Sequence, residues 1–212
     1  MSDEFAFFIV FIGAVVLAIV TLRSHGNYED QIPLKPGLYV VGCEIEPGKC
    51  DVKAATGGGN FIVRNKVAKA WECGNAIGDT SGLQPSRFRN LRLGRGDVLE
   101  INGNVTVLLT PPVPIRDPSE EPLGPGIYRF GIDVPPGKYD LEIVSGDGDV
   151  LLVEVKKDEY SFYQDMSLEN PIKAPSFNNI VCTPEFELWV NGSLQVKLNP
   201  SEKQPWFLRK QY

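Results

Sequence analysis

The stretch PLKPGLYVVG at residues 33–42 returns as PLGPGIYRFG at residues 122–131, which is 89 positions later. In the same register, EIEPGKCD at residues 44–51 returns as DVPPGKYD at residues 133–140. The offset still holds further along, where Asn102-Gly103 matches Asn191-Gly192. One register kept over such a distance indicates that a structural unit has been duplicated. The sequence therefore predicts one fold built twice.

The repeat divides the chain into five parts. We expect a transmembrane anchor with its juxtamembrane segment at 1–32, a first repeat at 33–111, a Pro-rich linker at 112–121, a second repeat at 122–200 and a tail at 201–212. Pro112, Pro114 and Pro118 should keep the linker extended and stiff.

Within each repeat, short apolar runs alternate with Gly- and Pro-rich turns, a pattern typical of strands. The turn at 46–49 follows the apolar run 38–41, so we expect a β-hairpin to open each repeat. Gly146 to Asp149 and Asn191-Gly192 also stand between strand-like runs, and Asn-Gly is the strongest short hairpin signal. We predict an all-β chain with two homologous antiparallel β-sandwich or barrel domains, preceded by one transmembrane helix.

Residues 5–22 read FAFFIVFIGAVVLAIVTL and carry no charge. As a helix this segment would be about 27 Å long, close to the thickness of the hydrocarbon core of a bilayer. A cleaved signal peptide would begin with basic residues and end at a small-residue site, whereas this chain begins Ser2-Asp3-Glu4. We therefore expect Phe5 to Leu22 to be an uncleaved, single-pass anchor whose partner is the lipid bilayer.

Basic residues gather in one short stretch of the first repeat, at Arg87, Arg89, Arg92 and Arg95. The first repeat holds 10 Lys and Arg against 7 Asp and Glu, whereas the second holds 6 against 12. The arginines could bind anionic lipid or an envelope polymer, dock the basic repeat on the acidic one, or form a solvated strand face. The net charge of -6 argues against nucleic acid as the main partner.

The four cysteines also have two readings. Cys43 and Cys50 flank the turn at 46–49 and could form a disulfide across the expected hairpin. Against a bridge, all four cysteines, including Cys73 and Cys182, match apolar or aromatic residues of the other repeat, which favours reduced thiols packed in the core. Their spacing does not fit a zinc site.

Nothing in the sequence resembles a catalytic centre, so we expect neither enzymatic activity nor a cofactor or metal. The single histidine, His25, stands beside the anchor, where it cannot serve a nucleophile in the repeats. The carboxylate pairs Glu44 with Glu46 and Asp147 with Asp149 could serve acid-base chemistry, but both lie at turns, where such residues shape the backbone.

Aromatic residues are candidates for stacking on sugar rings or for the core, and these are Tyr160, Phe162, Tyr163, Trp189 and Trp206. Strand alternation places Trp189 on the face of Glu187, opposite Leu188 and Val190. We expect Trp189 to point outwards, as a binding residue or under the tail. Trp206 is either a binding residue or that cover.

The segments at 37–50 and 126–139 resemble a repeat of tethered surface proteins and lipoproteins of Gram-positive bacteria, with the pattern G-x-Y-x-V-G-x-D-I-x-x-G-x-Y. Glu44 replaces the Asp of that pattern and Cys50 replaces its last aromatic residue. The resemblance implies domains outside the cytoplasm. Arg23, the one basic residue close to the anchor, places them in the cytoplasm by the positive-inside rule. We expect the extracytoplasmic arrangement at the cell membrane.

Taken together, these features predict a membrane-anchored, non-enzymatic binding or scaffold protein whose partner is a cell-envelope glycan or another protein. An envelope hydrolase that uses paired carboxylates, and a structural spacer, are the alternatives.

Overall fold

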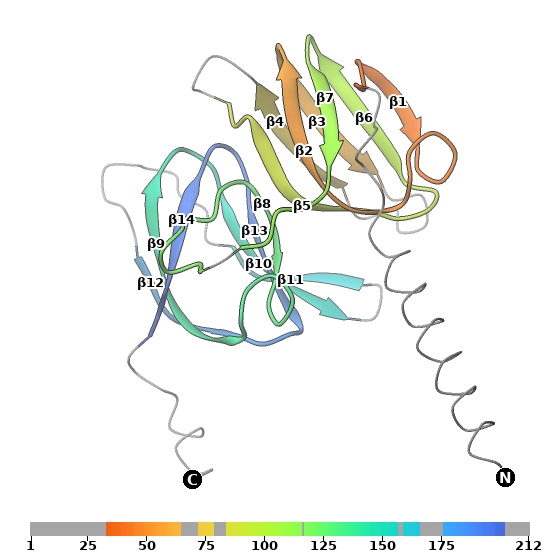
Figure 1. The fold of residues 1–212 in the computed structure, drawn as a ribbon. Coiled ribbons are helices and arrows are strands. Elements are labelled where there is room, and N and C mark those ends of the chain that lie inside the picture. Colours follow the sequence, from red (N-terminus) through yellow and green to blue (C-terminus); the bar gives the residue numbers. More distant parts are fainter. Residues whose placement is uncertain are drawn as a thin grey trace, which may run out of the picture.

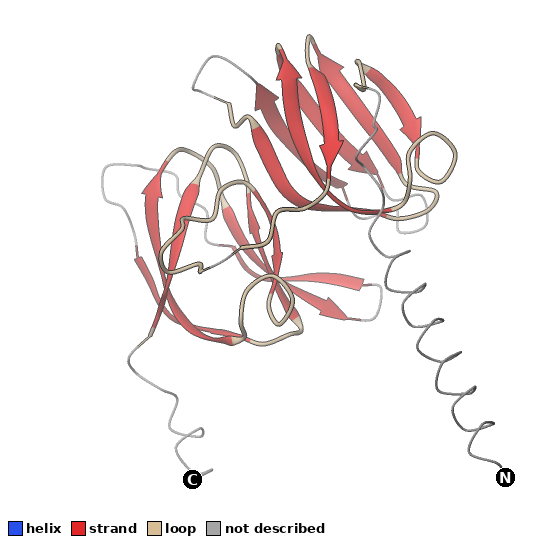
Figure 2. Ribbon diagram, in the orientation of Figure 1, coloured by secondary structure: helices blue, strands red, loops and turns tan. Residues whose placement is uncertain are grey.

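A computed structural model describes residues 33–64, 72–78, 84–115, 117–156, 159–165 and 176–201. These residues form fourteen strands and no helix (Figure 2), so the all-β prediction is confirmed. Within these ranges no helix is long and apolar enough to cross a membrane. The expected anchor at 5–22 lies outside the described residues, and it stays a prediction.

Each repeat contributes seven strands. The first repeat has β1 (Gly37–Val40), β2 (Gly48–Thr56), β3 (Gly58–Arg64), β4 (Glu72–Gly78), β5 (Arg87–Leu93), β6 (Val98–Gly103) and β7 (Thr106–Thr110). The second has β8 (Gly126–Arg129), β9 (Gly137–Ser145), β10 (Val150–Lys156), β11 (Glu159–Asp165), β12 (Ser176–Cys182), β13 (Phe186–Val190) and β14 (Gln195–Pro200).

The strands form three sheets, and one of them runs through both repeats (Figure 1). The sheet β1-β6-β3-β4 belongs to the first repeat, and β12-β9-β14 belongs to the second. The third sheet, β11-β10-β13-β8-β5-β2-β7, joins the two repeats through β8 and β5. Each repeat therefore has a four-stranded layer and a three-stranded layer. These are β1-β6-β3-β4 and β5-β2-β7 in the first repeat, and β11-β10-β13-β8 and β12-β9-β14 in the second.

The pairing register repeats as faithfully as the sequence. Gly37 pairs with Ile101, and 89 positions later Gly126 pairs with Val190. The same offset relates the pairings of β2 with β5 and of β9 with β12. The duplication seen in the sequence is therefore a duplication of strand pairing.

The expected hairpins are wrong, although the strands themselves exist. Strand β1 pairs with β6 and not with β2, which pairs with β5 and β7. Likewise β9 does not pair with β10, and β13 does not pair with β14. At each of these turns the chain crosses from one sheet to the other. Among the described strands, only β3 with β4 and β10 with β11 are paired neighbours in sequence.

Glycines are needed at these crossings because two loops touch there through their backbones. A Cβ atom on Gly57 would lie 1.7 Å from the carbonyl oxygen of Asn104. In the second repeat, a Cβ on Gly146 would lie 2.2 Å from the carbonyl oxygen of Ser193, and Gly192 has a φ of 70°. The Asn191-Gly192 signal therefore marks a close crossing of loops instead of a hairpin.

Three tyrosines hold the starts of strands by one device. Tyr39, Tyr128 and Tyr139 each follow a Pro-Gly pair by one intervening residue. Each hydroxyl donates to the carbonyl oxygen four residues earlier, at Lys35 (2.7 Å), Gly124 (2.6 Å) and Pro135 (2.8 Å). A fourth Pro-Gly pair, Pro47-Gly48, is followed at the equivalent position by Cys50 instead of a tyrosine, and Cys50 packs in the core.

A bulge fixed by an aspartate occurs in both repeats. Asn90 and Asn179 are the two non-glycine residues with positive φ in the described chain, at 58° and 64°. The N–H of Asn90 donates to the carboxylate of Asp51 (2.8 Å), and that of Asn179 donates to Asp140 (2.7 Å). Asparagine tolerates the left-handed conformation better than other side chains, which explains its place in both bulges.

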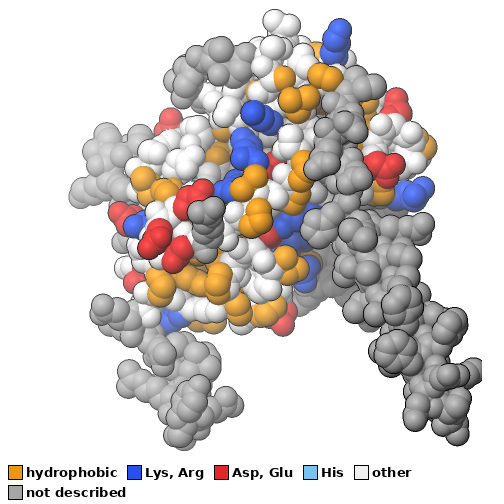
Figure 3. All heavy atoms as spheres, viewed as in Figure 1, with side chains coloured by type: hydrophobic (Ala, Val, Ile, Leu, Met, Phe, Trp, Pro, Cys, Tyr) orange, Lys and Arg blue, Asp and Glu red, His pale blue; other side chains and the backbone are white. Residues whose placement is uncertain are grey.

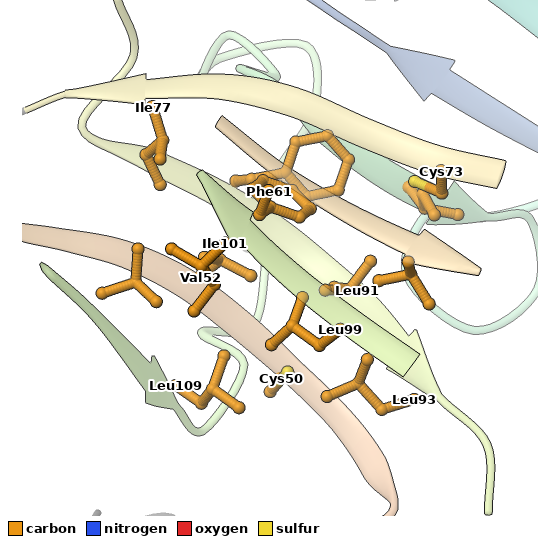
Figure 4. Packing of buried hydrophobic residues seen from close by; sticks show 14 of the residues in the cluster. Cys50, Val52, Phe61, Cys73, Ile77, Leu91, Leu93, Leu99, Ile101 and Leu109 are labelled. Carbon is orange, nitrogen blue, oxygen red and sulfur yellow. The ribbon is translucent and has the colours of Figure 1, made fainter. Parts of the chain in front are cut away.

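Two hydrophobic cores lie between the sheets. The first contains Phe61 and Phe88, whose rings meet edge to face with centroids 5.2 Å apart. Cys50 packs in this core among leucines of facing strands (Figure 4). The second core is built from the second repeat alone and contains Tyr128, Phe130 and Tyr139 among others. The first core also takes in residues of the second repeat, as described below.

Replacing Asn179 with Ala should lower the free energy of unfolding by about 1 kcal/mol, because a Cβ-bearing residue without a polar side chain is strained at positive φ. Asn179→Gly should be close to neutral, since glycine adopts this conformation freely. Denaturant unfolding of the full chain in detergent measures both. The neighbouring exposed Asn178→Ala is the control, and an equal loss in Asn178→Ala and Asn179→Ala would contradict the role of the bulge.

Candidate functional site

The contact between the repeats, called the junction from here on, begins with backbone. Strand β5 pairs with β8 in a parallel bridge between Arg89 and Gly126, and the N–H of Arg89 donates to the carbonyl oxygen of Pro125 (2.9 Å). A Cβ on Gly126 would lie 2.7 Å from the carbonyl oxygen of Arg89. Glycine at 126 therefore lets the two strands approach this closely.

The four arginines predicted as binding residues lie on or just after β5, and most of them are engaged inside the molecule. Arg87 forms an ion pair with Asp51 (2.8 Å). Arg89 donates to the carbonyl oxygen of Val113 (3.2 Å) and lies 3.9 Å from the carboxylate of Glu121. Of the three interpretations given to this cluster, these contacts favour docking within the protein.

Arg92 and Arg95 differ from one another. Arg92 forms an ion pair with Glu187 of the second repeat, whose side chain is 1% exposed. Arg95 is exposed, and its aliphatic part lies over Gly42. Figure 3 shows Lys and Arg side chains along the boundary between the repeats, with a group of Asp and Glu on the second repeat. Opposite charges thus meet at the junction.

Two further polar contacts cross the junction. Lys49 forms an ion pair with Asp133. The side-chain amide of Asn75 donates to the carbonyl oxygen of Gly192 and accepts from its N–H, both at 3.0 Å. This pair of bonds fixes the β4 side of the first repeat against a crossing loop of the second.

The expectation that Trp189 is exposed is wrong, although its direction is right. Leu188 and Val190 point into the core of the second repeat, so Trp189 points out of it. There it packs with Ile127 and Val153 on the core of the first repeat, and it is 4% exposed. Its indole N–H donates to Glu187 (3.1 Å). Among the described residues, the first repeat covers this ring.

Burial shifts the pKa of two groups near the junction. Burial, and then the nearby carboxylate of Glu187, raise the pKa of the Cys73 thiol to about 12. Burial also raises the pKa of Tyr128 above its ordinary value, an effect that Arg89 opposes. Both groups therefore stay neutral at physiological pH.

Asp51 ties the linker to the junction. This fully buried carboxylate accepts from the N–H of Asn90, pairs with Arg87 and accepts from the N–H of Val113 (3.4 Å). The linker is not extended throughout as expected, because Asp117 accepts from the N–H and hydroxyl of Ser119 and begins a turn. These bonds attach the linker to the repeats along part of its length.

A cleft of about 700 Å³ opens beside the junction. Polar side chains from both repeats and the linker line it, together with prolines and glycines. They include Gln84, Ser86, Arg87, Arg89, Glu121, Ser145, Ser193 and Gln195. The Nε atoms of Arg87 and Arg89 are buried and have no hydrogen-bond partner. Two cations and several hydroxyl and amide groups thus converge on one space.

The remaining predicted candidates contribute no side chain to the described lining of the cleft. Trp206 is outside the described residues, and the side chains of Tyr160, Phe162 and Tyr163 are as well. The carboxylates of Glu44 and Asp149 serve loop geometry, since they accept from the N–H of Val40 (2.8 Å) and the amide of Asn191 (2.7 Å). Neither carboxylate pair lines the cleft.

The structure does not contain the disulfide between Cys43 and Cys50. Cys43 is exposed in the loop after β1, whereas Cys50 points into the core. Cys73 and Cys182 are also buried, as the alternative interpretation predicted. Burial raises the pKa of Cys182 to about 12. The expectation of a core position is wrong for Cys43, whose counterpart Ile132 is likewise exposed.

Sequence reasoning missed Lys49, Asn75, Asp133 and Glu187 at the junction. A signal existed for Glu187, which stands where the first repeat has Val98, but not for Lys49 and Asp133, whose counterparts Lys138 and Glu44 carry the same charges. The partners of Glu187 at the junction show the same kind of difference. Trp189 stands where the first repeat has Glu100, and Arg92 stands where the second has Val181. A difference in polarity at matching positions marks surfaces that the two repeats use differently.

The chain must be interpreted from this geometry. Comparison with family models, with curated proteins and with solved structures gives no match. Within the described residues, no group of three or more His, Cys, Asp or Glu side chains is placed to hold a metal ion. The junction and its cleft are the features with the clearest functional chemistry.

Replacing Arg92 with Met should lower the free energy of unfolding by about 2 kcal/mol, because the buried carboxylate of Glu187 then loses a charged partner. Adding Glu187→Gln should recover part of this loss, since the amide carries no charge and still accepts from Trp189. Denaturant unfolding of the two single variants and the double variant measures the coupling. Arg95→Met is the control, and we expect it to be nearly neutral; an equal loss there would contradict the assignment.

Proposed function

We propose that this protein is a membrane-anchored, non-enzymatic binding scaffold of the cell envelope. Residues 5–22 anchor it in the bilayer, and the repeats fold as two β-sandwich domains outside the cytoplasm. The ligand is a cell-envelope glycan that carries acidic groups, and it binds in the cleft beside the junction.

A scaffold requires that its parts keep a fixed arrangement, and the junction supports this. Ion pairs from Lys49 and Arg92, the amide of Asn75 and the buried ring of Trp189 hold the repeats together. The contacts differ in chemistry and spread over several strands. Rotation of one repeat on the other would expose Trp189 and break ion pairs that are partly buried.

The observation that carries the choice of ligand is the composition of the cleft. Arg87 and Arg89 line the cleft and supply positive charge for carboxylate or phosphate groups, although Asp51 and Glu121 each neutralise part of it. Gln84, Ser145 and Gln195 supply hydrogen bonds of the kind that sugar hydroxyls accept and donate. The described lining contains no aromatic ring, so recognition here depends on polar contacts.

The hydrolase alternative is less well supported. Acid-base cleavage of a glycosidic bond uses two carboxylates about 5 to 9 Å apart. Glu121 is the one carboxylate among the described residues that line the cleft, and it lies beside Arg89. A second, smaller groove lies near Ile132. Asp133 is the one carboxylate among the described residues that line it, and it pairs with Lys49. Binding is therefore the better interpretation of both spaces.

Filling the cleft tests the proposal. Ser145→Trp should weaken binding of the full chain, in detergent micelles, to soluble envelope-glycan fragments by about tenfold or more, because the ring occupies the ligand's space. Val144→Trp is the matched control, since Val144 is also exposed but points away from the cleft lining. Fluorescence or calorimetric titration gives the dissociation constants. Equal affinity in both variants would remove the cleft as the site, and no binding by the unaltered chain would favour a spacer.

Membrane orientation has a built-in reporter in Cys43. A membrane-impermeant maleimide added to intact cells should label the unaltered chain and not Cys43→Ser, since Cys43 is exposed while Cys50, Cys73 and Cys182 are buried. Lysed cells provide the control for total reactivity. Labelling that requires lysis would place the repeats in the cytoplasm and contradict the proposed location.

A further inference from the structure

The junction inside the chain has a counterpart that is left open at the two ends of the molecule. We propose that separate copies of this protein associate head to tail, with β1 of one copy docking beside β12 of the next. The contact would repeat between molecules the arrangement of β8 beside β5. This assembly goes beyond the proposed function and does not depend on the ligand.

The strand order leaves the required edges unpaired. Strand β8 is the last strand of its repeat's four-stranded set and joins β5 of the first repeat. The strand equivalent to β8 is β1, which ends the sheet β1-β6-β3-β4. The strand equivalent to β5 is β12, which ends the sheet β12-β9-β14. Among the sheet ends of the described strands, β1 and β12 are therefore the duplicates of the two strands that the chain itself joins.

Apolar side chains mark these two edges. Ile127 on β8 is 2% exposed because the first repeat covers it, whereas its equivalent Leu38 on β1 is 64% exposed. Val40 beside it is also exposed, at 37%. On β12, Val181 is 44% exposed and stands where β5 has Arg92. Exposed apolar residues on both edges suit burial against one another.

The residues that form ion pairs across the junction have complementary equivalents. Arg92 and Glu187 correspond to Val181 and Val98, so an ion pair is replaced by two apolar side chains. Lys49 and Asp133 correspond to Lys138 and Glu44, which keeps the charges opposite.

Glu44 is held in the same way as its equivalent. One oxygen of Asp133 accepts from the N–H of Arg129 (3.0 Å) while the other pairs with Lys49. One oxygen of Glu44 accepts from the N–H of Val40 (2.8 Å). The backbone N–H at the end of β1 therefore holds the carboxylate of Glu44 in the same way as the backbone N–H at the end of β8 holds that of Asp133. The repeats also differ in overall charge, which favours an acidic second repeat against a basic first one.

One difference sets the strength of the association. Trp189 and Val153, which are buried at the junction, correspond to Glu100 and Arg64, which form an ion pair of 2.8 Å. The face of the first repeat therefore buries less apolar surface than its equivalent. The internal junction also has the linker, which holds its two sides at high effective concentration. Association between molecules is accordingly weaker and reversible, and a head-to-tail contact allows further copies to add.

The test uses the full chain in detergent micelles under reducing conditions, with its mass followed against concentration by sedimentation. The unaltered chain should form dimers and longer species as its concentration rises. Leu38→Lys blocks the β1 edge and Val181→Lys blocks the β12 edge, and each should raise the concentration needed for association by about tenfold or more. Val144→Lys, an exposed valine away from both edges, should associate as the unaltered chain does.

Mixing the two blocked variants distinguishes head-to-tail contact from other kinds. Each variant keeps one working edge, so an equimolar mixture should form dimers and nothing larger. Association of Val181→Lys by itself at the concentrations where the unaltered chain associates would indicate symmetric pairing of β1 with β1 and would overturn the proposal. A chain that stays monomeric at all concentrations, or associates equally in every variant, would overturn it as well.

Discussion

Both repeats depend on the crossing of two loops whose backbones touch. Gly57 lies against Asn104 in the first repeat, and Gly146 lies against Ser193 in the second, at distances that leave no room for a Cβ atom. The strands that these loops connect, β2 with β3 and β6 with β7 in the first repeat and β9 with β10 and β13 with β14 in the second, belong to opposite sheets. The core, the free edges and the contact between the repeats all follow from this exchange of sheets.

The junction lies where the two repeats differ in their side chains. Ile127 and Trp189 of the second repeat became buried, and their equivalents Leu38 and Glu100 did not. Arg92 forms an ion pair with Glu187, whereas Val181, the equivalent of Arg92 in the second repeat, is exposed. The junction brings the basic part of one repeat to the acidic part of the other, and the cleft that we propose as the ligand site lies beside it.

Strand positions could be predicted from the sequence, but strand partners could not. Alternating apolar residues mark a strand whichever sheet it joins, so β1, β2, β9 and β13 were all predicted near their observed positions. Asn191-Gly192 looked like a hairpin because a glycine with positive φ serves both a tight turn and a close crossing of loops. The outward direction of Trp189 followed from alternation. The burial of Trp189 could not be predicted from the sequence. The surface that covers it comes from residues about 100 positions away, and no sequence pattern marks them as its partners.

The pairing of β1 with β6 has a consequence for how the chain acquires its structure. Gly37 emerges from the ribosome long before Ile101, its partner, so the earliest strand cannot complete its ladder until nearly all of the first repeat has been synthesised. Contacts so distant along the chain make folding slow, since the intervening segment must be ordered before they form. Arg89 then provides a finished backbone edge on which Gly126 can add. The order of synthesis thus places the β5 edge of the first repeat before the β8 strand that pairs with it.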